Sequence, residues 1–267
     1  MTTAGQDFGP VLRHWRGRRR LSQLALAGAA GLSQRHLSFL EGGRAAPSRE
    51  MALRLAEALG LPLRARNGLL AAAGFAAVYP ERSLDAPDMA AALSAVETVL
   101  RAHEPWPALA VDRHWRLLRA NAAVPPLLAG AAPALLVPPV NVLRLSLHPE
   151  GLAPRIRNWR QWRTHVTARL AAQAEAEGDA DLAALLEELR SYPAPPGIRP
   201  WKAEMRAPFA GIALPLELET GAGVLSLLST TTVFGTATDI TLAEVTIETF
   251  LPMDEATAAA LRGAGGA

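Results

Sequence analysis

Residues 21–41 read LSQLALAGAAGLSQRHLSFLE, and this stretch decides the fold of the first third of the chain. Its apolar residues recur at helical spacing on both sides of Gly31, a residue type that tolerates the backbone of a tight turn. Ser22 and Ser33 stand just before the two apolar series, where a hydroxyl can accept from the free N–H groups of a first helical turn. The layout predicts a helix-turn-helix.

The same helical spacing continues on either side of this stretch, from Phe8 to about Ala77. Gly, Pro and Ser interrupt it at intervals of roughly ten residues, and Ser48 is a third candidate cap. The pattern predicts an all-α domain of five short helices, at about residues 8–20, 22–30, 33–41, 48–59 and 63–73.

Polar side chains remain on the outer face of the second predicted helix of the motif. Arginine pairs with guanine, glutamine with adenine, and an apolar ring packs against a thymine methyl in the major groove. We therefore predict base contacts from Ser33, Gln34, Arg35, Ser38 and Phe39. Phosphate contacts are predicted from residues near helix starts, namely Gln23, Arg44, Ser48 and Arg49.

The formal net charge of +2 conceals an uneven distribution. Residues 1–82 carry twelve arginines against five acidic residues, a net +7, whereas residues 83–267 carry a net −5. A basic first third is typical of a chain that binds a polyanion, and the helix pattern favours double-stranded DNA as that partner.

The chain contains no cysteine, which excludes disulfides, thiolate metal sites and a cysteine nucleophile, and which favours a cytoplasmic location. It also has no run of eighteen apolar residues and no apolar segment typical of a signal peptide near Met1, so we expect no membrane association.

A Pro- and Asp-containing stretch, residues 78–88, marks a linker, so we place the domains at residues 1–80 and 91–267 with residues 81–90 between them. Beyond it, helices are expected at about residues 89–103, 155–177 and 180–189. Strands are expected at about residues 108–112, 115–119, 212–218, 224–234 and 241–251. Helices and strands are grouped and do not alternate regularly, which favours an antiparallel α+β domain.

Several motifs resemble those of Xre/Cro-type regulators that carry an MmyB-like C-terminal domain. The resemblance is specific over residues 8–80, where it rests on residues 32–41, Gly43-Arg44, Pro47-Ser48-Arg49, residues 55–59, Leu69-Leu70 and Ala73-Gly74-Phe75. In the second domain it rests on Asp112, Trp115, Asn121, Asn158-Trp159 and a terminal strand within residues 250–255. The Ala- and Pro-rich residues 123–139 depart from the family pattern.

This resemblance implies a lambda-repressor-like DNA-binding domain and a PAS-like ligand-binding domain whose family ligands are fatty acids. Such a domain folds helices over one face of an antiparallel sheet around an apolar space. From period-two and helical spacing we predict its walls at Leu109, Val111, Trp159, Trp162, Val166, Leu216, Leu225, Leu227, Val245 and Ile247. A ligand carboxylate would require a cation, and Arg155, Arg157, Arg160 and Arg163 are equal candidates.

Other functions stay open as alternatives. The second domain could be a solid-core module for dimerisation or protein docking, and in either case we expect a homodimer. We expect no enzyme, cofactor or metal site, because neither a phosphate loop nor metal-ligand spacing occurs. Haem would require an axial histidine from His103, His114, His148 or His165, and a self-cleaving Ser/Lys repressor would require Lys202 as a base.

Overall fold

The structure is a computed structural model that describes residues 8–197 and 214–264. The chain forms two compact units, the first mainly from residues up to Arg82 and the second mainly from Ser83 onward. We refer to them as the N-terminal and C-terminal units.

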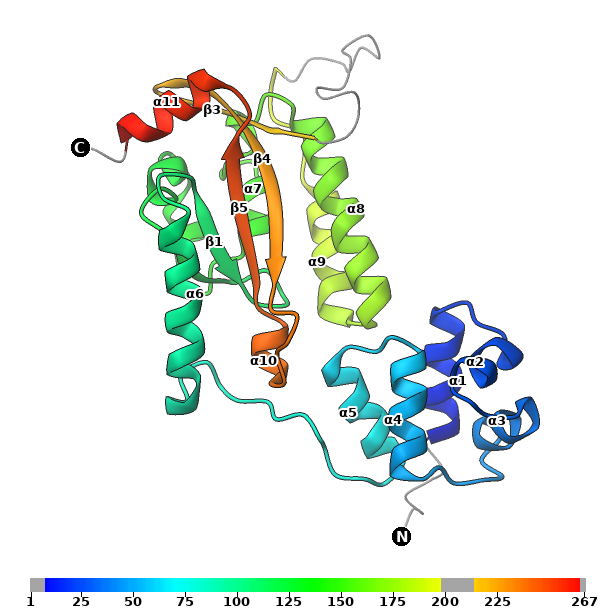
Figure 1. The fold of residues 1–267 in the computed structure, drawn as a ribbon. Coiled ribbons are helices and arrows are strands. Elements are labelled where there is room, and N and C mark those ends of the chain that lie inside the picture. Colours follow the sequence, from blue (N-terminus) through cyan, green and yellow to red (C-terminus); the bar gives the residue numbers. More distant parts are fainter. Residues whose placement is uncertain (1–7, 198–213, 265–267) are drawn as a thin grey trace. The chain divides into compact units, whose positions relative to one another are not determined.

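The N-terminal unit is helical, as predicted, and each helix lies within two residues of its expected position (Figure 1). The helices are α1 (Phe8–Arg18), α2 (Gln23–Ala29), α3 (Gln34–Glu41), α4 (Arg49–Ala58) and α5 (Leu63–Ala72). All three predicted serine caps form, because the hydroxyls of Ser22, Ser33 and Ser48 accept from the backbone N–H three residues later at 3.0–3.1 Å.

The turn between α2 and α3 contains Gly31, whose φ is +66°. Few residue types other than glycine adopt this conformation without strain, which explains the position of the turn. Leu26 and Ala27 of α2 and Leu37 and Leu40 of α3 are completely buried against the rest of the unit. The helix-turn-helix is therefore fixed by both its turn chemistry and its apolar spacing.

The C-terminal unit is an antiparallel α+β domain, as predicted. Its sheet has the strand order β2-β1-β5-β4-β3, and every neighbouring pair is antiparallel. The strands are β1 (Ala108–Val111), β2 (Leu117–Ala120), β3 (Leu216–Thr220), β4 (Gly223–Val233) and β5 (Thr246–Pro252). Its helices are α6 (Ala90–Ala102), α7 (Val142–Leu147), α8 (Trp159–Glu177), α9 (Ala180–Ser191) and α11 (Glu255–Ala264). The short helix α10 (Ile240–Ala243) is assigned to the N-terminal unit.

Helices cover both faces of this sheet, with α6 on one face and α8 and α9 on the other (Figure 1). Leu109, Leu216 and Leu227 pack in the core that α8 and α9 cover. Val245 and Ile247 instead pack with Val96 and Leu100 of α6. The prediction that Val245 and Ile247 line the pocket was therefore wrong, because period-two alternation separates the two faces of a strand without indicating which one adjoins the pocket.

Several predicted element boundaries were also wrong. The last strand begins at Thr246, because Asp239 accepts from the N–H groups of Thr241 and Leu242 and so starts the short helix α10. That strand ends at Pro252, and a helix that we did not predict, α11, begins at Glu255.

The other differences lie around the proline-rich segments. Residues 123–139 contain two 3-10 turns, Pro125–Leu128 and Pro133–Leu136, and the next helix, α7, was not predicted. A 3-10 turn also occupies Ala153–Arg155, so α8 starts at Trp159 and not at residue 155. The strand expected at residues 212–218 begins at Leu216, and Ile212 lies outside the described residues.

Candidate functional sites: the reading helix and the apolar pocket

The outer face of α3 carries the residues predicted to contact bases. Gln34 and Arg35 are exposed, whereas Ser38 and Phe39 are half-buried. Ser33 also is exposed, although its hydroxyl oxygen already accepts as the cap of α3. The face therefore presents amide, guanidinium, hydroxyl and aromatic groups side by side, as groove recognition requires.

Phe39 brings two of the predicted DNA-contacting arginines together. The guanidinium carbons of Arg35 and Arg44 lie 5.3 and 4.4 Å from the centroid of the Phe39 ring, within the range of cation–π attraction. Arg49, at the start of α4, is exposed as well, and Ser48 beside it caps that helix. Two predicted base-contacting residues, Arg35 and Phe39, thus lie together with one predicted phosphate-contacting residue, Arg44.

Gln23 has a different environment from the one we predicted. Its amide nitrogen donates to a carboxylate oxygen of Glu41 at 2.8 Å, and Glu41 is only 3% exposed. Gln23 therefore links α2 to the end of α3 through one N–H of its amide, and its contact with a phosphate stays a prediction. His36 packs against α4, because its Nε2 lies 3.3 Å from the sulfur of Met51.

The buried Glu41 was not identified from the sequence. Its carboxylate also accepts from Nε and Nη2 of Arg16, at 2.6 and 2.9 Å. Burial alone would raise the pKa of Glu41, but the hydrogen bonds from Arg16 and Gln23 and the charges of Arg16 and Arg13 outweigh it and keep the pKa below its usual value. The helical spacing of Glu41 relative to Leu37 was the available signal, since it places both on the buried face.

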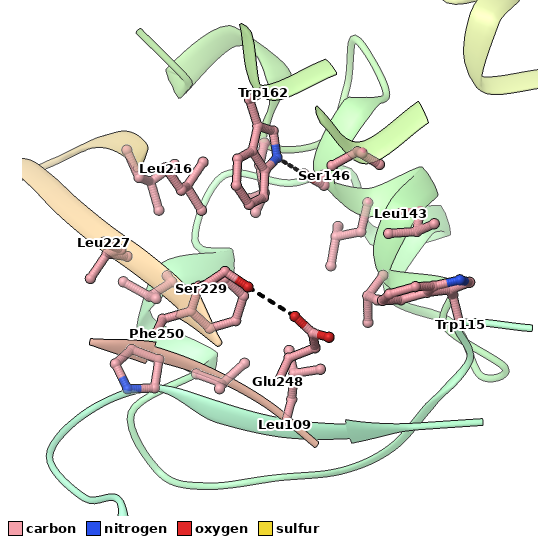
Figure 2. A pocket seen from close by; sticks show the side chains of 18 of the residues that line it. Leu109, Trp115, Leu143, Ser146, Trp162, Leu216, Leu227, Ser229, Glu248 and Phe250 are labelled. Atoms are coloured by element: carbon pink, nitrogen blue, oxygen red, sulfur yellow. Dashed lines mark hydrogen bonds between the residues drawn. The ribbon is translucent and has the colours of Figure 1, made fainter. Parts of the chain in front are cut away.

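An apolar cavity of about 110 Å³ lies between the sheet and helices α7 and α8 (Figure 2). Five of the ten predicted wall residues line it, namely Leu109, Trp162, Val166, Leu216 and Leu227. Three more are buried in the core around the cavity but do not line it in the described structure, namely Val111, Trp159 and Leu225. The remaining two, Val245 and Ile247, lie on the sheet face that α6 covers.

Much of the cavity wall comes from segments that the sequence analysis did not assign to it. The unpredicted α7 supplies Leu143, Leu145 and Ser146, and the Ala- and Pro-rich region supplies Val124, Leu127 and Leu128. Trp115 and Phe250 also line the cavity. These contributions depend on tertiary contacts between distant segments, which periodicity within one segment cannot reveal.

A cluster of polar groups interrupts the apolar wall where α8 faces β4 and β5. The carboxylate of Glu248 points into the cavity, and Ser229 donates to it at 2.9 Å (Figure 2). Arg169 donates to both of its oxygens, at 2.5 and 3.1 Å, and Thr231 donates to one of them at 3.0 Å. The guanidinium carbon of Arg169 also lies 4.6 Å from the centroid of the Trp115 ring.

None of the four arginines predicted as candidate anchors is among the described residues that line the cavity. Arg155 donates to the carbonyl of Leu127 at 2.5 Å, and burial lowers its pKa. Arg157 and Arg160 are exposed, and Arg163 bonds to the carbonyl of Arg190. Within the described wall, Arg169 is the arginine that reaches the cavity.

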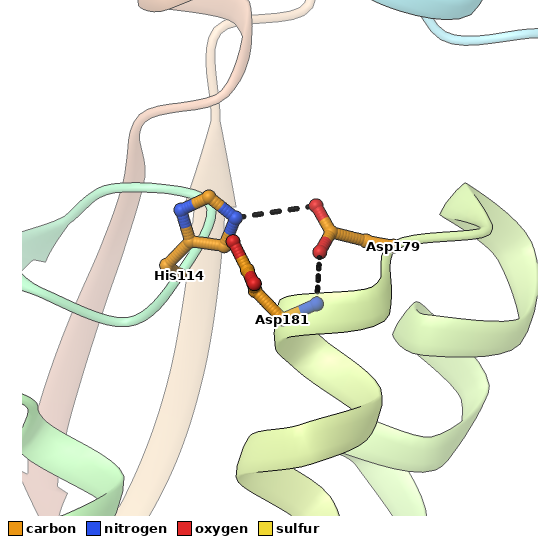
Figure 3. Close-up of side chains that lie close together, drawn as sticks. All are labelled: His114, Asp179 and Asp181. Carbon is orange, nitrogen blue, oxygen red and sulfur yellow. Dashed lines mark hydrogen bonds and ion pairs between the residues drawn. The ribbon is translucent and has the colours of Figure 1, made fainter.

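A second polar cluster joins the β1–β2 hairpin to the start of α9 (Figure 3). Nε2 of His114 lies 3.2 Å from Oδ2 of Asp179. The side-chain atoms of His114, Asp179 and Asp181 that could bind a metal ion lie within 4.8 Å of one another. Arg113 forms an ion pair with Asp179, which also caps α9 by accepting from two backbone N–H groups. Because a guanidinium already neutralises Asp179, we interpret the cluster as a structural link.

The residues that haem binding or self-cleavage would require do not form a common site in the described structure. Of the four histidines considered for haem, His165 is the one that lines the cavity in the described structure. His103 bonds to the carbonyl of Val99 at 2.7 Å, and His148 stacks edge-on against Tyr192. Lys202 lies outside the described residues.

A helix-turn-helix unit combined with an antiparallel α+β unit around an apolar pocket defines a class of DNA-binding regulators with a ligand-binding domain. The family model described as the MmyB-like transcription regulator ligand binding domain matches residues 92–264, and a helix-turn-helix domain model matches residues 7–69. The chain belongs to the family of MmyB-like transcription regulators. No curated protein matches the chain. Across the described residues, no helix combines the length and apolar character needed to cross a bilayer.

Proposed function

We propose that this regulator reads double-stranded DNA with α3 as an Xre-type homodimer and that an apolar small molecule in the C-terminal unit changes its affinity for DNA. The observation that supports this proposal is the cavity of about 110 Å³ with mainly aliphatic and aromatic walls. The resemblance to the family favours a fatty acid as the ligand. The proposal includes no catalytic step and no cofactor, and it places the protein with its DNA in the cytoplasm.

The size and chemistry of the cavity favour an alkyl or acyl chain. Burial of a methylene group contributes about 0.8 kcal/mol, so a chain of medium length binds without any charged contact. The cavity is smaller than the roughly 150 Å³ that holds benzene in an engineered protein core. A medium-length chain must therefore displace lining side chains or extend toward the polar edge at Arg169.

A dimerisation or docking module is the second candidate function, and it requires only a filled core. The apolar cavity favours the ligand-binding function, because an empty apolar space removes packing contacts and so costs stability. Homodimerisation is compatible with both functions. Sedimentation of the full chain with and without operator DNA tests it.

Native mass spectrometry of the purified chain and thermal shifts with a series of alkyl compounds test the ligand-binding function. We expect a bound apolar molecule, or stabilisation that increases with chain length up to the capacity of the cavity. Val166→Phe fills the cavity and should abolish this stabilisation. Ile247→Val, on the opposite sheet face, should leave it unchanged while costing about 1 kcal/mol of stability. Absence of binding by every compound would contradict the proposal.

A further inference from the structure

We propose that the effector joins its apolar chain to an uncharged polar head, such as an alcohol, amide or ester, and that the free carboxylate of the same chain binds more weakly. This inference rests on the proposed function, since it assumes that the cavity is the ligand site. It keeps the acyl or alkyl chain proposed above, but it favours an uncharged derivative of that chain over the free fatty acid that the family resemblance suggests.

The first argument is that Glu248 has a complete set of partners. One oxygen accepts from Arg169 and Thr231, and the other accepts from Arg169 and Ser229. The residue is 4% exposed, and these donors compensate for the loss of water around its carboxylate. Glu248 therefore stays at the polar edge of the cavity as a fixed negative charge.

The second argument is that Arg169 is already used. Both terminal nitrogens donate to Glu248, and Nη2 also donates to Thr231 at 2.9 Å. Among the described lining residues, Arg169 and Glu248 form an ion pair with each other, and their charges cancel. The cavity therefore offers no net positive charge to an anionic head.

A carboxylate at this edge has two ways to reach Arg169, and both are unfavourable. If it shares the guanidinium with Glu248, two negative charges lie within a few ångströms in a partly dehydrated site. If it displaces Glu248, a buried carboxylate keeps only the hydroxyls of Ser229 and Thr231. Loss of one partner from a buried ion pair is strongly destabilising, so an anion gains little from this arginine.

An uncharged head avoids both costs and finds suitable partners. Ser146 lines the cavity and accepts from Nε1 of Trp162 at 2.9 Å, which leaves its own hydroxyl proton available to a carbonyl or hydroxyl oxygen. His165 lies one turn before Arg169 on α8 and also lines the cavity. Burial and the charge of Arg169 lower the pKa of His165, although Glu248 opposes them, so a neutral imidazole can donate or accept.

The test compares octanoate, 1-octanol and octanamide on the full chain at neutral pH. Trp115 and Trp162 line the cavity, so quenching of tryptophan fluorescence, checked by calorimetry, reports binding. We expect 1-octanol and octanamide to bind at least tenfold more tightly than octanoate. Octanoate binding as tightly as the uncharged compounds would overturn the inference while leaving the proposed function intact. Failure of all three to bind would instead overturn the proposed function.

Glu248→Gln provides the second arm of the test. It removes the negative charge and leaves Arg169 without its counter-ion, so octanoate should gain at least tenfold in affinity while 1-octanol changes less than threefold. Glu188→Gln is the matched control, because Glu188 pairs with Arg144 outside the cavity in the same way, at 2.7 Å. An unchanged octanoate affinity in folded Glu248→Gln would contradict the inference. If that variant does not fold, the wild-type ranking of the three compounds still decides.

Discussion

The guanidinium of Arg16 holds both carboxylate oxygens of Glu41, with Nε 2.6 Å from Oε1 and Nη2 2.9 Å from Oε2. Arg16 belongs to α1, and Glu41 is the last residue of α3. Gln23 of α2 adds a third hydrogen bond to the same carboxylate. A single buried acidic group therefore links the helix-turn-helix to the helix that supports it.

Glu41→Ala should destabilise the N-terminal unit by about 3–5 kcal/mol, the usual cost of removing one partner from a buried ion pair. The side chain of Glu41 is 1% exposed, so little water can replace it beside Arg16. Urea denaturation followed by circular dichroism measures the change. Glu57→Ala, at an exposed position of α4, is the control and should stay within about 0.5 kcal/mol of wild type. A loss of less than about 1 kcal/mol in Glu41→Ala would contradict the assigned role.

The same ion pair predicts how stability depends on pH. The folded-state pKa of Glu41 lies below its usual value, so the folded state binds its proton less readily than the unfolded state. The charged group therefore stabilises the fold fully above the unfolded-state pKa, and this contribution disappears as pH falls through the folded-state pKa. The stability difference between wild type and Glu41→Gln should thus be largest at neutral pH and shrink below about pH 4. Urea titrations at several pH values test this, and a difference independent of pH would disprove it.

Gly9 and Gly17 form a matched pair within α1. A Cβ at Gly9 would lie 2.6 Å from the carbonyl oxygen of Glu41 and 2.8 Å from that of Leu40, whereas a Cβ at Gly17 would meet nothing within 4 Å. Gly9→Ala should therefore separate α1 from α3 and cost about 1–3 kcal/mol. Gly17→Ala should stabilise the helix by up to about 1 kcal/mol. Thermal denaturation distinguishes them, and equal effects would refute the close approach.

Local signals were sufficient to predict the N-terminal unit. Ser22, Ser33 and Ser48 cap the helices that follow them, and Gly31 makes the turn, all through contacts within a few residues. In the C-terminal unit, the same approach failed where distant contacts decide the structure. Helix α7 is only six residues long and starts with a cap from Asn141 after a proline-rich segment, so it offered no periodic pattern to detect.

The pocket illustrates the same limit. Alternation along β5 correctly separated Ile247 from Glu248, but an acidic residue is usually assigned to the solvent face. Here α6 covers the face of Ile247, and Glu248 points into the cavity because Arg169 of α8 neutralises it. Arg169 and Glu248 are 79 residues apart, so neither spacing nor composition could pair them.

Arg35 and Arg44 are predicted to have different roles in DNA binding although both contact Phe39. Arg35→Ala should cost about 1–3 kcal/mol and relax the preference at one base pair, since it removes a base contact. Arg44→Ala should weaken binding to all DNA sequences alike. It should also lower the slope of the logarithm of the binding constant against the logarithm of the salt concentration by about one in magnitude. Gel-shift titrations at several salt concentrations measure both quantities, with Arg101→Ala, exposed on α6, as the control. An unchanged operator preference in Arg35→Ala would show that α3 reads DNA in another register.

Trp159 and Trp162 begin α8 with indole rings in opposite hydrogen-bonding states. Nε1 of Trp159 is buried and has no partner among the described residues, whereas Nε1 of Trp162 donates to Ser146 at 2.9 Å. Replacement by Phe removes a similar part of each ring. The unsatisfied N–H of Trp159 destabilises the wild-type fold by about 1–3 kcal/mol. Trp159→Phe removes this N–H, and the stability regained offsets part of the packing lost with the smaller ring. Trp162→Phe instead breaks a hydrogen bond worth about 1 kcal/mol. Urea denaturation should therefore show that Trp162→Phe loses at least about 1 kcal/mol more than Trp159→Phe, and the reverse order would mean that Trp159 has a partner in solution.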